Sequence, residues 1–419
     1  MAHDYNGLRS RVHWIDVNIR TRTTHVLLAA ALAAGPGLAQ AQTLPVGPAR
    51  ALDGRLLVAG DATVTAGAAD DIAFFNYTDY EHNALRTFQV GLSAMWQPAH
   101  WLALVGDLRS EDVESVRAHA AYVRVRPWRD RAFDIQAGRI PPSFGAYGRR
   151  AYAADNAFIG YPLGYQYLTS LRADAVPRTA DDLLRMRARG WRAAYPIGSP
   201  VSGPGMPLVS ALRWDTGIQA HWSGTRADLA GSLTNGTLSS PRIGDDNASK
   251  QVSGRIGITP VTGLTLGASA ARGGWAAREV PGSSHAVQTA LGVDGEYSRA
   301  HWLLRGELVW SRWSLPVALA PSATTSVRAT AWWVEGRYRF TPRIFAAVRA
   351  DALGFSTISG TLFDSAPTKW DAPVQRVETV AGYYLQRNLV ARVGVQRNWR
   401  DAGRVLSRTY VSAQLSYWF

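Results

Sequence analysis

Hydrophobic and polar residues alternate with a period of two from about residue 55 to the C-terminus, rather than with the 3.6-residue period of a helix. The alternation is clearest in segments 87–96, 330–340 and 405–419. In the last segment, one face carries Val405, Ser407, Thr409, Val411, Ala413, Leu415, Tyr417 and Phe419, and the other carries Arg408, Tyr410, Ser412, Gln414 and Ser416. This pattern predicts strands with one apolar face and one polar face.

The breaks between these segments alternate between very short and long along the chain. Sixteen segments of roughly 10–15 residues lie between the breaks, which is the length of a tilted strand that crosses a bilayer. The predicted strands are 54–66, 85–97, 100–110, 116–126, 131–140, 208–222, 225–236, 250–259, 263–272, 286–298, 302–313, 327–340, 343–355, 375–386, 388–399 and 405–419.

An even number of strands joined in this way places both chain ends on the side of the short turns. Strands in lipid must close on themselves, because an open edge would leave backbone groups without hydrogen-bond partners. We therefore predict an all-β fold, a 16-stranded antiparallel transmembrane β-barrel spanning 54–419. The stretch 141–207 is its long third outer loop.

Composition supports many short strands with aromatic ends and tight turns, since the chain has 16 Trp, 16 Tyr and 39 Gly. Aromatic residues recur beside the short breaks, as Trp96 and Trp101 do around one and Tyr297 and Trp302 around another. Rings at strand ends suit a membrane interface, where one part of the ring is apolar and the other is wet.

The N-terminal segment reads as a secretion signal. Residues 26–34 form an apolar run preceded by Arg20 and Arg22, and Ala39-Gln40-Ala41 gives a small-residue cleavage site before residue 42. We expect 1–41 to be a signal peptide with an extended n-region and 42–53 to be a periplasmic lead-in to the barrel.

The C-terminal strand ends in Ser416-Tyr417-Trp418-Phe419 and resembles the assembly signal of Gram-negative outer-membrane proteins. The resemblance implies that the barrel-assembly machinery reads Tyr417 and Phe419. A second segment, 135–145 (IQAGRIPPSFG), resembles the G-x-x-x-x-P-F-G segment of the phosphate-selective (OprO/OprP-like) porins, with Ser143 inserted before Phe144. It implies an outer-membrane porin for small anions, in contact with membrane lipid and lipopolysaccharide, and often a homotrimer.

The net charge of +13 comes almost wholly from arginine, since Lys250 and Lys369 are the only lysines. Many arginines fall on the polar faces of the predicted strands, and guanidinium binds carboxylate or phosphate as a fork. We predict that they line the pore and favour anions; the alternative is that they pair with acids across strands and hold the barrel shape. The pore-lining candidates are Arg124, Arg126, Arg305, Arg337, Arg339 and Arg349.

The stretch 141–207 is too long for a simple connection, and loops of this length are usually functional or disordered. Its many tyrosines can bury area, which argues against disorder. The third loop of 16-stranded porins folds inward and narrows the pore, and the resemblance implies the same for 141–207, with Arg149, Arg150 and Tyr152 at the constriction. A lid over the outer surface is the alternative. Within it, 180–190 could form a short helix with Asp181 and Asp182 in its first turn.

The sequence gives little support for an enzyme, a metal site or a nucleic-acid-binding protein. No cysteine is present, the histidines are scattered, and the chain has neither a G-x-S-x-G elbow nor a phosphate-binding loop, so we expect no metal, no cofactor, no catalytic residues and no nucleic-acid partner. The leading function is a diffusion channel for small hydrophilic solutes. The alternatives are a plugged structural or receptor barrel and an outer-membrane barrel hydrolase.

Overall fold

The computed structural model describes residues 48–78, 82–128, 131–148, 156–210, 214–246 and 249–419. The predicted signal peptide therefore lies outside the described residues.

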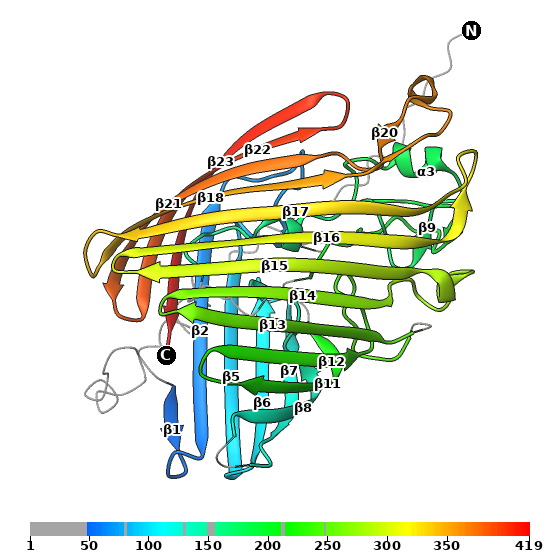
Figure 1. Cartoon of the computed structure of the whole chain (residues 1–419). Helices are drawn as coiled ribbons and strands as arrows, with labels where there is room; N and C mark the ends of the chain where they lie inside the picture. The colour runs from blue at the N-terminus through cyan, green and yellow to red at the C-terminus, as the bar shows by residue number, and fades with distance from the viewer. Residues whose placement is uncertain (1–47, 79–81, 129–130, 149–155, 211–213, 247–248) are drawn as a thin grey trace. The chain divides into compact units, whose positions relative to one another are not determined.

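Sixteen antiparallel strands form a closed barrel, which confirms the predicted fold (Figure 1). Each strand pairs with its neighbours, and β2 closes the sheet by pairing with β23 through Asp61–Trp418 to Gly67–Ser412. The barrel strands are β2 Leu56–Gly67, β5 Phe88–Ala99, β6 Leu102–Glu111, β7 Ser115–Val125, β8 Phe133–Ile140, β11 Asp215–Ser223, β12 Ala227–Thr234, β13 Gln251–Val261, β14 Leu264–Gly274, β15 Val287–Arg299, β16 Trp302–Leu319, β17 Thr324–Arg339, β18 Ile344–Phe355, β21 Val374–Gln386, β22 Leu389–Asp401 and β23 Val405–Trp418.

The two faces of the strands have the predicted character. In β17, Glu335 is buried inside the barrel, whereas Trp332 and Val334 face outward with 42% and 58% of their surface exposed. The same alternation exposes leucine, valine and tryptophan on the outer face of most strands. An apolar belt of this extent is stable only against apolar surroundings.

Two strand boundaries differ from the prediction for reasons of packing. The segment 314–326 reads as a polar, proline-containing loop, but β16 continues to Leu319 because Leu315 and Leu319 are buried against interior residues. The strand predicted from residue 208 begins only at Asp215, because Leu208 and Val209 are buried in the interior cluster instead of the wall.

The N-terminal lead-in contains a strand that the pattern did not predict, β1 (Ala49–Ala51). It pairs with Leu56–Val58 of β2, whereas β23 pairs with β2 only from Asp61 onward. The short hairpin thus covers the part of the β2 edge that the last strand does not reach, as exposed edges generally require.

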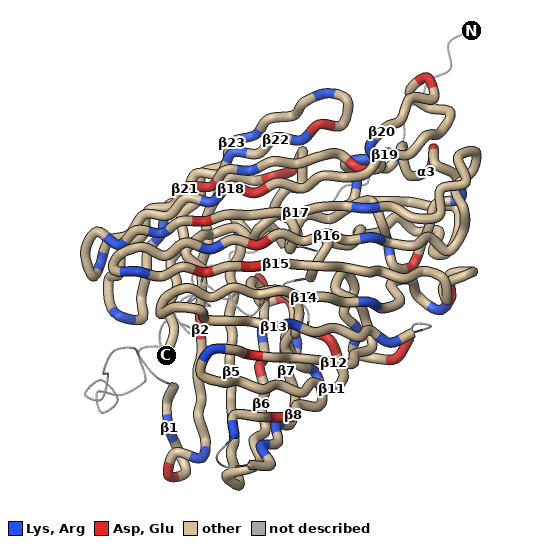
Figure 2. Tube along the Cα trace, viewed as in Figure 1, with Lys and Arg blue, Asp and Glu red and all other residues tan. Residues whose placement is uncertain are grey.

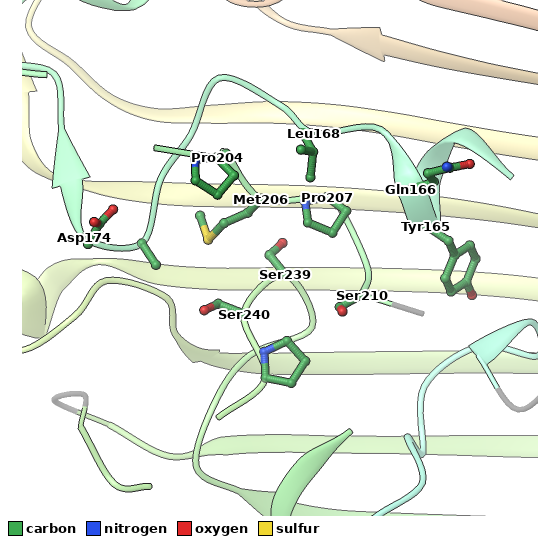
Figure 3. Close-up of a pocket in the computed structure, with 13 residues that line it drawn as sticks. Tyr165, Gln166, Leu168, Asp174, Pro204, Met206, Pro207, Ser210, Ser239 and Ser240 are labelled. Atoms are coloured by element: carbon green, nitrogen blue, oxygen red, sulfur yellow. The ribbon is translucent and has the colours of Figure 1, made fainter. Parts of the chain in front are cut away.

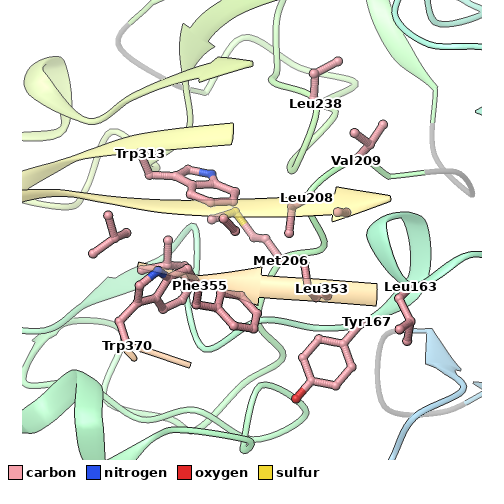
Figure 4. Close-up of a cluster of buried hydrophobic side chains, with 14 of the residues drawn as sticks. Leu163, Tyr167, Met206, Leu208, Val209, Leu238, Trp313, Leu353, Phe355 and Trp370 are labelled. Carbon is pink, nitrogen blue, oxygen red and sulfur yellow. The ribbon is translucent and has the colours of Figure 1, made fainter. Parts of the chain in front are cut away.

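The connection between β8 and β11 packs into a hydrophobic cluster near the long connections. Figure 4 shows Met206 and Leu208 beside Trp313 of β16, with Tyr167 and Trp370 of the β18–β21 connection in the same cluster. Both tryptophans are fully buried, with their ring centroids 6.1 Å apart. Apolar burial therefore fixes much of this connection to the barrel wall.

Short elements complete the described chain. Helix α3 (Ala180–Arg185) starts where predicted, with a capping box between Thr179 and Asp182, but ends before residue 190. No helix in the described residues has the length and apolar character needed to span a membrane. The other short elements are α2 Leu163–Gln166, η3 Ser283–His285, η4 Phe363–Ser365 and the strand pairs β3 Tyr77–Thr78 with β4 His82–Asn83, β9 Ala175–Val176 with β10 Ile197–Gly198, and β19 Thr357–Ile358 with β20 Thr368–Lys369.

Candidate pore interior

The segment that follows β8, called the inner segment (described residues 141–148 and 156–210), runs along the inner wall of the barrel. The Ser143 hydroxyl lies 2.9 Å from that of Ser232 on β12 and 2.7 Å from that of Ser253 on β13. Two residues on, the Gly145 amide donates to the Ser269 hydroxyl of β14 at 3.0 Å. Because these serines are inward-facing and buried, the segment is held on the inside of the barrel.

Glycine is required at position 145 for two reasons. Its φ is +68°, which side chains other than glycine rarely adopt, and a Cβ there would lie 2.3 Å from a Glu307 carboxylate oxygen. The Glu307 side chain of β16 is buried inside the barrel. Its carboxylate accepts a hydrogen bond from the Tyr165 hydroxyl at 2.7 Å and another from the Trp333 indole N–H at 3.2 Å. Because residue 145 has no side chain, the Glu307 carboxylate can lie close to it while it also binds Tyr165 and Trp333.

Further along, the segment binds to the opposite part of the wall through carboxylates. The amides of Ile159 and Gly160 donate to Glu378 on β21 at 3.1 and 3.0 Å. The Leu163 amide donates to Asp351 on β18 at 2.9 Å. Carboxylates that accept backbone N–H groups replace the strand partners that this irregular chain lacks.

Two buried arginines complete this attachment. Arg349, with none of its surface exposed, donates to the Gly160 carbonyl at 2.8 Å and to Glu378 at 2.7 Å. Arg376 donates to the carbonyls of Tyr161 and Phe75, each at 2.9 Å. The structure thus places the candidate Arg349 beneath residues 158–160, where it anchors the segment.

Other inward arginines pair with acids that lie one or two strands away. Arg255 lies between Asp228 at 3.1 Å and Asp294 at 2.6 Å. The candidate Arg305 lies between Glu296 at 3.0 Å and Glu335 at 3.7 Å. For these residues the structure has the cross-strand pairing that the sequence left open as an alternative.

The remaining wall candidates form no ion pair with a carboxylate of the described residues: Arg124, Arg126, Arg337 and Arg339. Arg124 contacts the Met95 sulfur at 3.2 Å, and the Arg339 guanidinium lies 5.8 Å from the centre of the Tyr384 ring. All four lie toward the short-turn ends of β7 and β17, where Figure 2 shows basic residues gathered near the turns. This end of the barrel interior therefore carries an excess of positive charge.

Sequence reasoning missed a polar group on the wall formed by β2, β5 and β6. Arg109 pairs with Asp107 at 2.9 Å and with Asp61 at 3.5 Å, and all three side chains retain some exposure. The alternation could have indicated Asp107 and Arg109, because Leu104 and Leu108 mark the outer face. A register shift between Asp107 and Leu108 weakens that pattern.

The inner segment reaches toward the same wall through Tyr161. Its hydroxyl bonds to Gln89 of β5, and burial, with a smaller contribution from nearby Glu111, raises the pKa of Tyr161 to about 12. Tyr161 is therefore a neutral hydroxyl at physiological pH. The segment and the β5–β6 wall are thus joined by a neutral hydrogen bond.

The proposed constriction residues Arg149, Arg150 and Tyr152 lie outside the described residues. On either side of them, the Asn156 amide donates to the Tyr147 hydroxyl at 3.2 Å, and the Tyr147 ring packs 5.7 Å from that of Trp333. The chain before and after them is therefore fixed near one place on β17.

The cavities of the described residues that adjoin this interior include two that are larger than a third beside Ser143. One, of about 240 Å³, lies between the inner segment and residues 239–241; Figure 3 shows Pro204, Pro207 and Met206 facing Ser239 and Ser240 across it. The other, of about 400 Å³, lies at the short-turn end and includes Arg126, Arg131 and His221 in its lining. In the described part of the chain, no group of three or more His, Cys, Asp or Glu side chains could hold a metal ion.

The barrel is similar to solved bacterial outer-membrane channels. The outer membrane channel DcaP of Acinetobacter baumannii matches with 12% identity and a TM-score of 0.51, over 89% of this chain and 100% of that chain. The anion-selective porin from Comamonas acidovorans matches with 9% identity and a TM-score of 0.51, over 87% and 99%. This chain has the porin fold. OmpF of Salmonella typhi matches similarly, with 12% identity and a TM-score of 0.51 over 87% and 97%.

Sequence comparison adds no closer relationship. No protein-family model matches the chain, and no curated protein sequence matches it. At these identities the porin fold is shared, whereas solute and selectivity have to be inferred from the residues of this chain.

Proposed function

We propose that the protein is a passive diffusion channel of the Gram-negative outer membrane, for small hydrophilic solutes and with a preference for anions. The observation that carries the proposal is a closed barrel with an apolar outer face, a polar inner face and an inner segment attached to the wall by Glu307, Asp351 and Glu378. Such a segment narrows the lumen, so that solutes have to pass along the polar residues that line the remaining opening. A channel of this kind performs no reaction.

The preference for anions rests on which charges are neutralised. The wall acids Asp228, Asp294 and Glu378 pair with arginines. Arg337 and Arg339 are inward-facing and have no such partner among the described residues. A wall with this excess of positive potential raises the local concentration of anions at the pore mouth. Phosphate is one candidate solute, because guanidinium groups bind it as a fork.

The constriction is proposed to include Arg149, Arg150 and Tyr152, since the chain on both sides of them is fixed to the inner wall. The same proposal includes a signal peptide and the reading of Tyr417 and Phe419 by the assembly machinery. It also includes contact with lipopolysaccharide and assembly into a homotrimer. It places the short turns in the periplasm and the long connections at the cell surface.

Planar-bilayer recording tests the proposal with the purified full-length protein. We expect stepwise increases in current as single channels open. In a KCl gradient, we expect the reversal potential to have the sign that results when chloride is more permeant than potassium. The variant Arg337→Gln/Arg339→Gln should move that potential toward zero, whereas Arg397→Gln, an outward-facing arginine on β22, should leave it unchanged.

Two results would contradict the proposal. A membrane that stays sealed after insertion of folded protein favours the plugged receptor barrel. A reversal potential of the opposite sign, with conducting channels, rejects the preference for anions while keeping the channel.

A further inference from the structure

The cavity of about 240 Å³ beside the inner segment has one wall formed by residues 204–207 (PGMP). The Met206 amide donates to the Leu171 carbonyl at 2.7 Å, and the Thr169 amide donates to the Met206 carbonyl at 3.0 Å. Gly205 packs so closely against this part of the chain that a Cβ would overlap the Thr169 carbonyl oxygen. Because the two prolines also restrict the backbone, this proline wall is rigid before any ligand binds.

The facing wall of the cavity is the β12–β13 connection at residues 239–241. The Ser239 hydroxyl donates to the Leu208 carbonyl at 2.9 Å, and the Ser239 amide donates to the side-chain oxygen of Gln288 on β15 at 3.1 Å. These bonds attach the connection both to the inner segment and to the barrel. The space between the two walls is therefore preformed, as binding sites for small molecules usually are.

Two hydroxyl groups at this cavity are available to a ligand. Ser210 and Ser240 are half-buried lining residues, and neither hydroxyl has a hydrogen-bond partner among the described residues. A serine hydroxyl can donate one hydrogen bond and accept two. Pro204 and Met206 lie opposite Ser240 (Figure 3). The cavity thus combines an apolar wall with a few hydroxyl groups.

The charges around the cavity indicate a neutral ligand. Asp174 is the one charged side chain among the described residues that line it. Its two carboxylate oxygens accept hydrogen bonds from the buried Arg172 guanidinium at 2.9 and 2.7 Å, so its charge is balanced. The described lining therefore offers an anion no guanidinium or ammonium group, and it offers a cation no unbalanced carboxylate.

We propose that this cavity binds a neutral, hydroxylated ring of the size of a monosaccharide. Its volume of about 240 Å³ corresponds to roughly eight water molecules, at about 30 Å³ each. A pyranose has apolar C–H faces, which match the proline wall, and hydroxyl groups at its edge, which match Ser210 and Ser240. The inference goes beyond the proposed preference for anions, because it concerns a neutral solute held near the long connections, away from Arg337 and Arg339.

Saturation-transfer NMR with D-glucose and the detergent-solubilised full-length protein tests the inference, because this method detects weak, reversible binding. We expect saturation transfer to glucose and a dissociation constant that rises about fivefold or more in Ser210→Ala/Ser240→Ala, which lacks two neutral hydrogen-bonding groups. Both serines are half-buried and their hydroxyls bond to no described residue, so the variant should fold. Ser240→Phe, which places a ring in the cavity, should abolish the transfer.

Ser284→Ala is the matched control, because Ser284 is an exposed serine of another long connection and does not line the cavity. An unchanged dissociation constant in the double variant overturns the inference. Absence of transfer to glucose, or displacement of glucose by an equal concentration of phosphate, also overturns it.

Channel recording on the same samples separates this inference from the proposed function. Conducting, chloride-selective channels without glucose binding reject only the monosaccharide site. Glucose binding by a protein that leaves the membrane sealed rejects only the diffusion channel.

Discussion

At the scale of single residues, inward-facing arginines of this barrel differ sharply in what they contact. Arg349 is fully buried against Glu378 and the Gly160 carbonyl, whereas Arg337 has no carboxylate partner among the described residues. Arg349→Gln should leave Glu378 as an uncompensated buried charge, which typically costs about 3–5 kcal/mol. We expect a lower thermal unfolding midpoint and faster hydrogen exchange at Ile159 and Gly160, the amides that this carboxylate binds.

The double variant Arg349→Gln/Glu378→Gln is the control at this scale. Neutral amides can keep part of the hydrogen bonding without a buried charge, so the double variant should unfold at a higher temperature than the single one. If Arg349→Gln alone unfolds at the temperature of the unchanged protein, Arg349 is not an anchor of the inner segment.

At the scale of elements, helix α3 is joined to the β18–β21 connection through Asp181. This carboxylate accepts the Thr361 hydroxyl, the Thr361 amide at 2.8 Å and the Leu362 amide at 3.1 Å. The Thr361 hydroxyl, followed by the two amides, lowers the pKa of Asp181 below its ordinary 3.8. A lowered pKa in the folded state means that the contact is complete above pH 3.8 and is lost as the pH falls through the folded-state value.

Hydrogen exchange at Thr361 and Leu362, corrected for the intrinsic effect of pH, should therefore accelerate on acidification below about pH 3.8. Asp181→Asn should remove most of this acid dependence, because the amide does not titrate. Asp364→Asn, at an exposed acid of the neighbouring η4, should leave it intact. Equal protection of Thr361 and Leu362 at pH 7 in the unchanged protein and in Asp181→Asn would show that Asp181 does not join the two elements.

At the scale of the whole molecule, the excess of inward arginines acts through its summed field on solutes. Screening shortens the range of that field from about 10 Å at 0.1 M salt to about 3 Å at 1 M. The ratio of chloride to potassium permeability should therefore fall toward the ratio of their bulk mobilities as salt rises, measured from reversal potentials at a fixed concentration gradient. A ratio that stays constant over this range would mean that direct binding at the constriction, rather than the field of the mouth, sets selectivity.

The strands illustrate what can be read locally. Residues 330–340 and 405–419 alternate without interruption, and their faces and ends agree closely with the structure. The stretch 314–326 is predicted to be a loop because it is polar and contains prolines, but residues 314–319 continue β16, since Leu315 and Leu319 are buried against distant residues. Secondary structure is thus predictable from the sequence where one face of a segment meets apolar surroundings and the other meets polar ones. It is less predictable where contacts with distant residues decide the conformation.

The sequence by itself determined the sixteen strands, the alternation of short and long connections, the inner and outer faces and the start of helix α3, because each depends on neighbours within a few residues. Only the tertiary structure decided which arginines carry unbalanced charge. Arg305 and Arg337 both face inward on adjacent strands, yet register pairs Arg305 with Glu296 and Glu335, whereas it pairs Arg337 with Leu303 and Ala347. Pairing across strands joins residues far apart in the chain, so no local pattern encodes it.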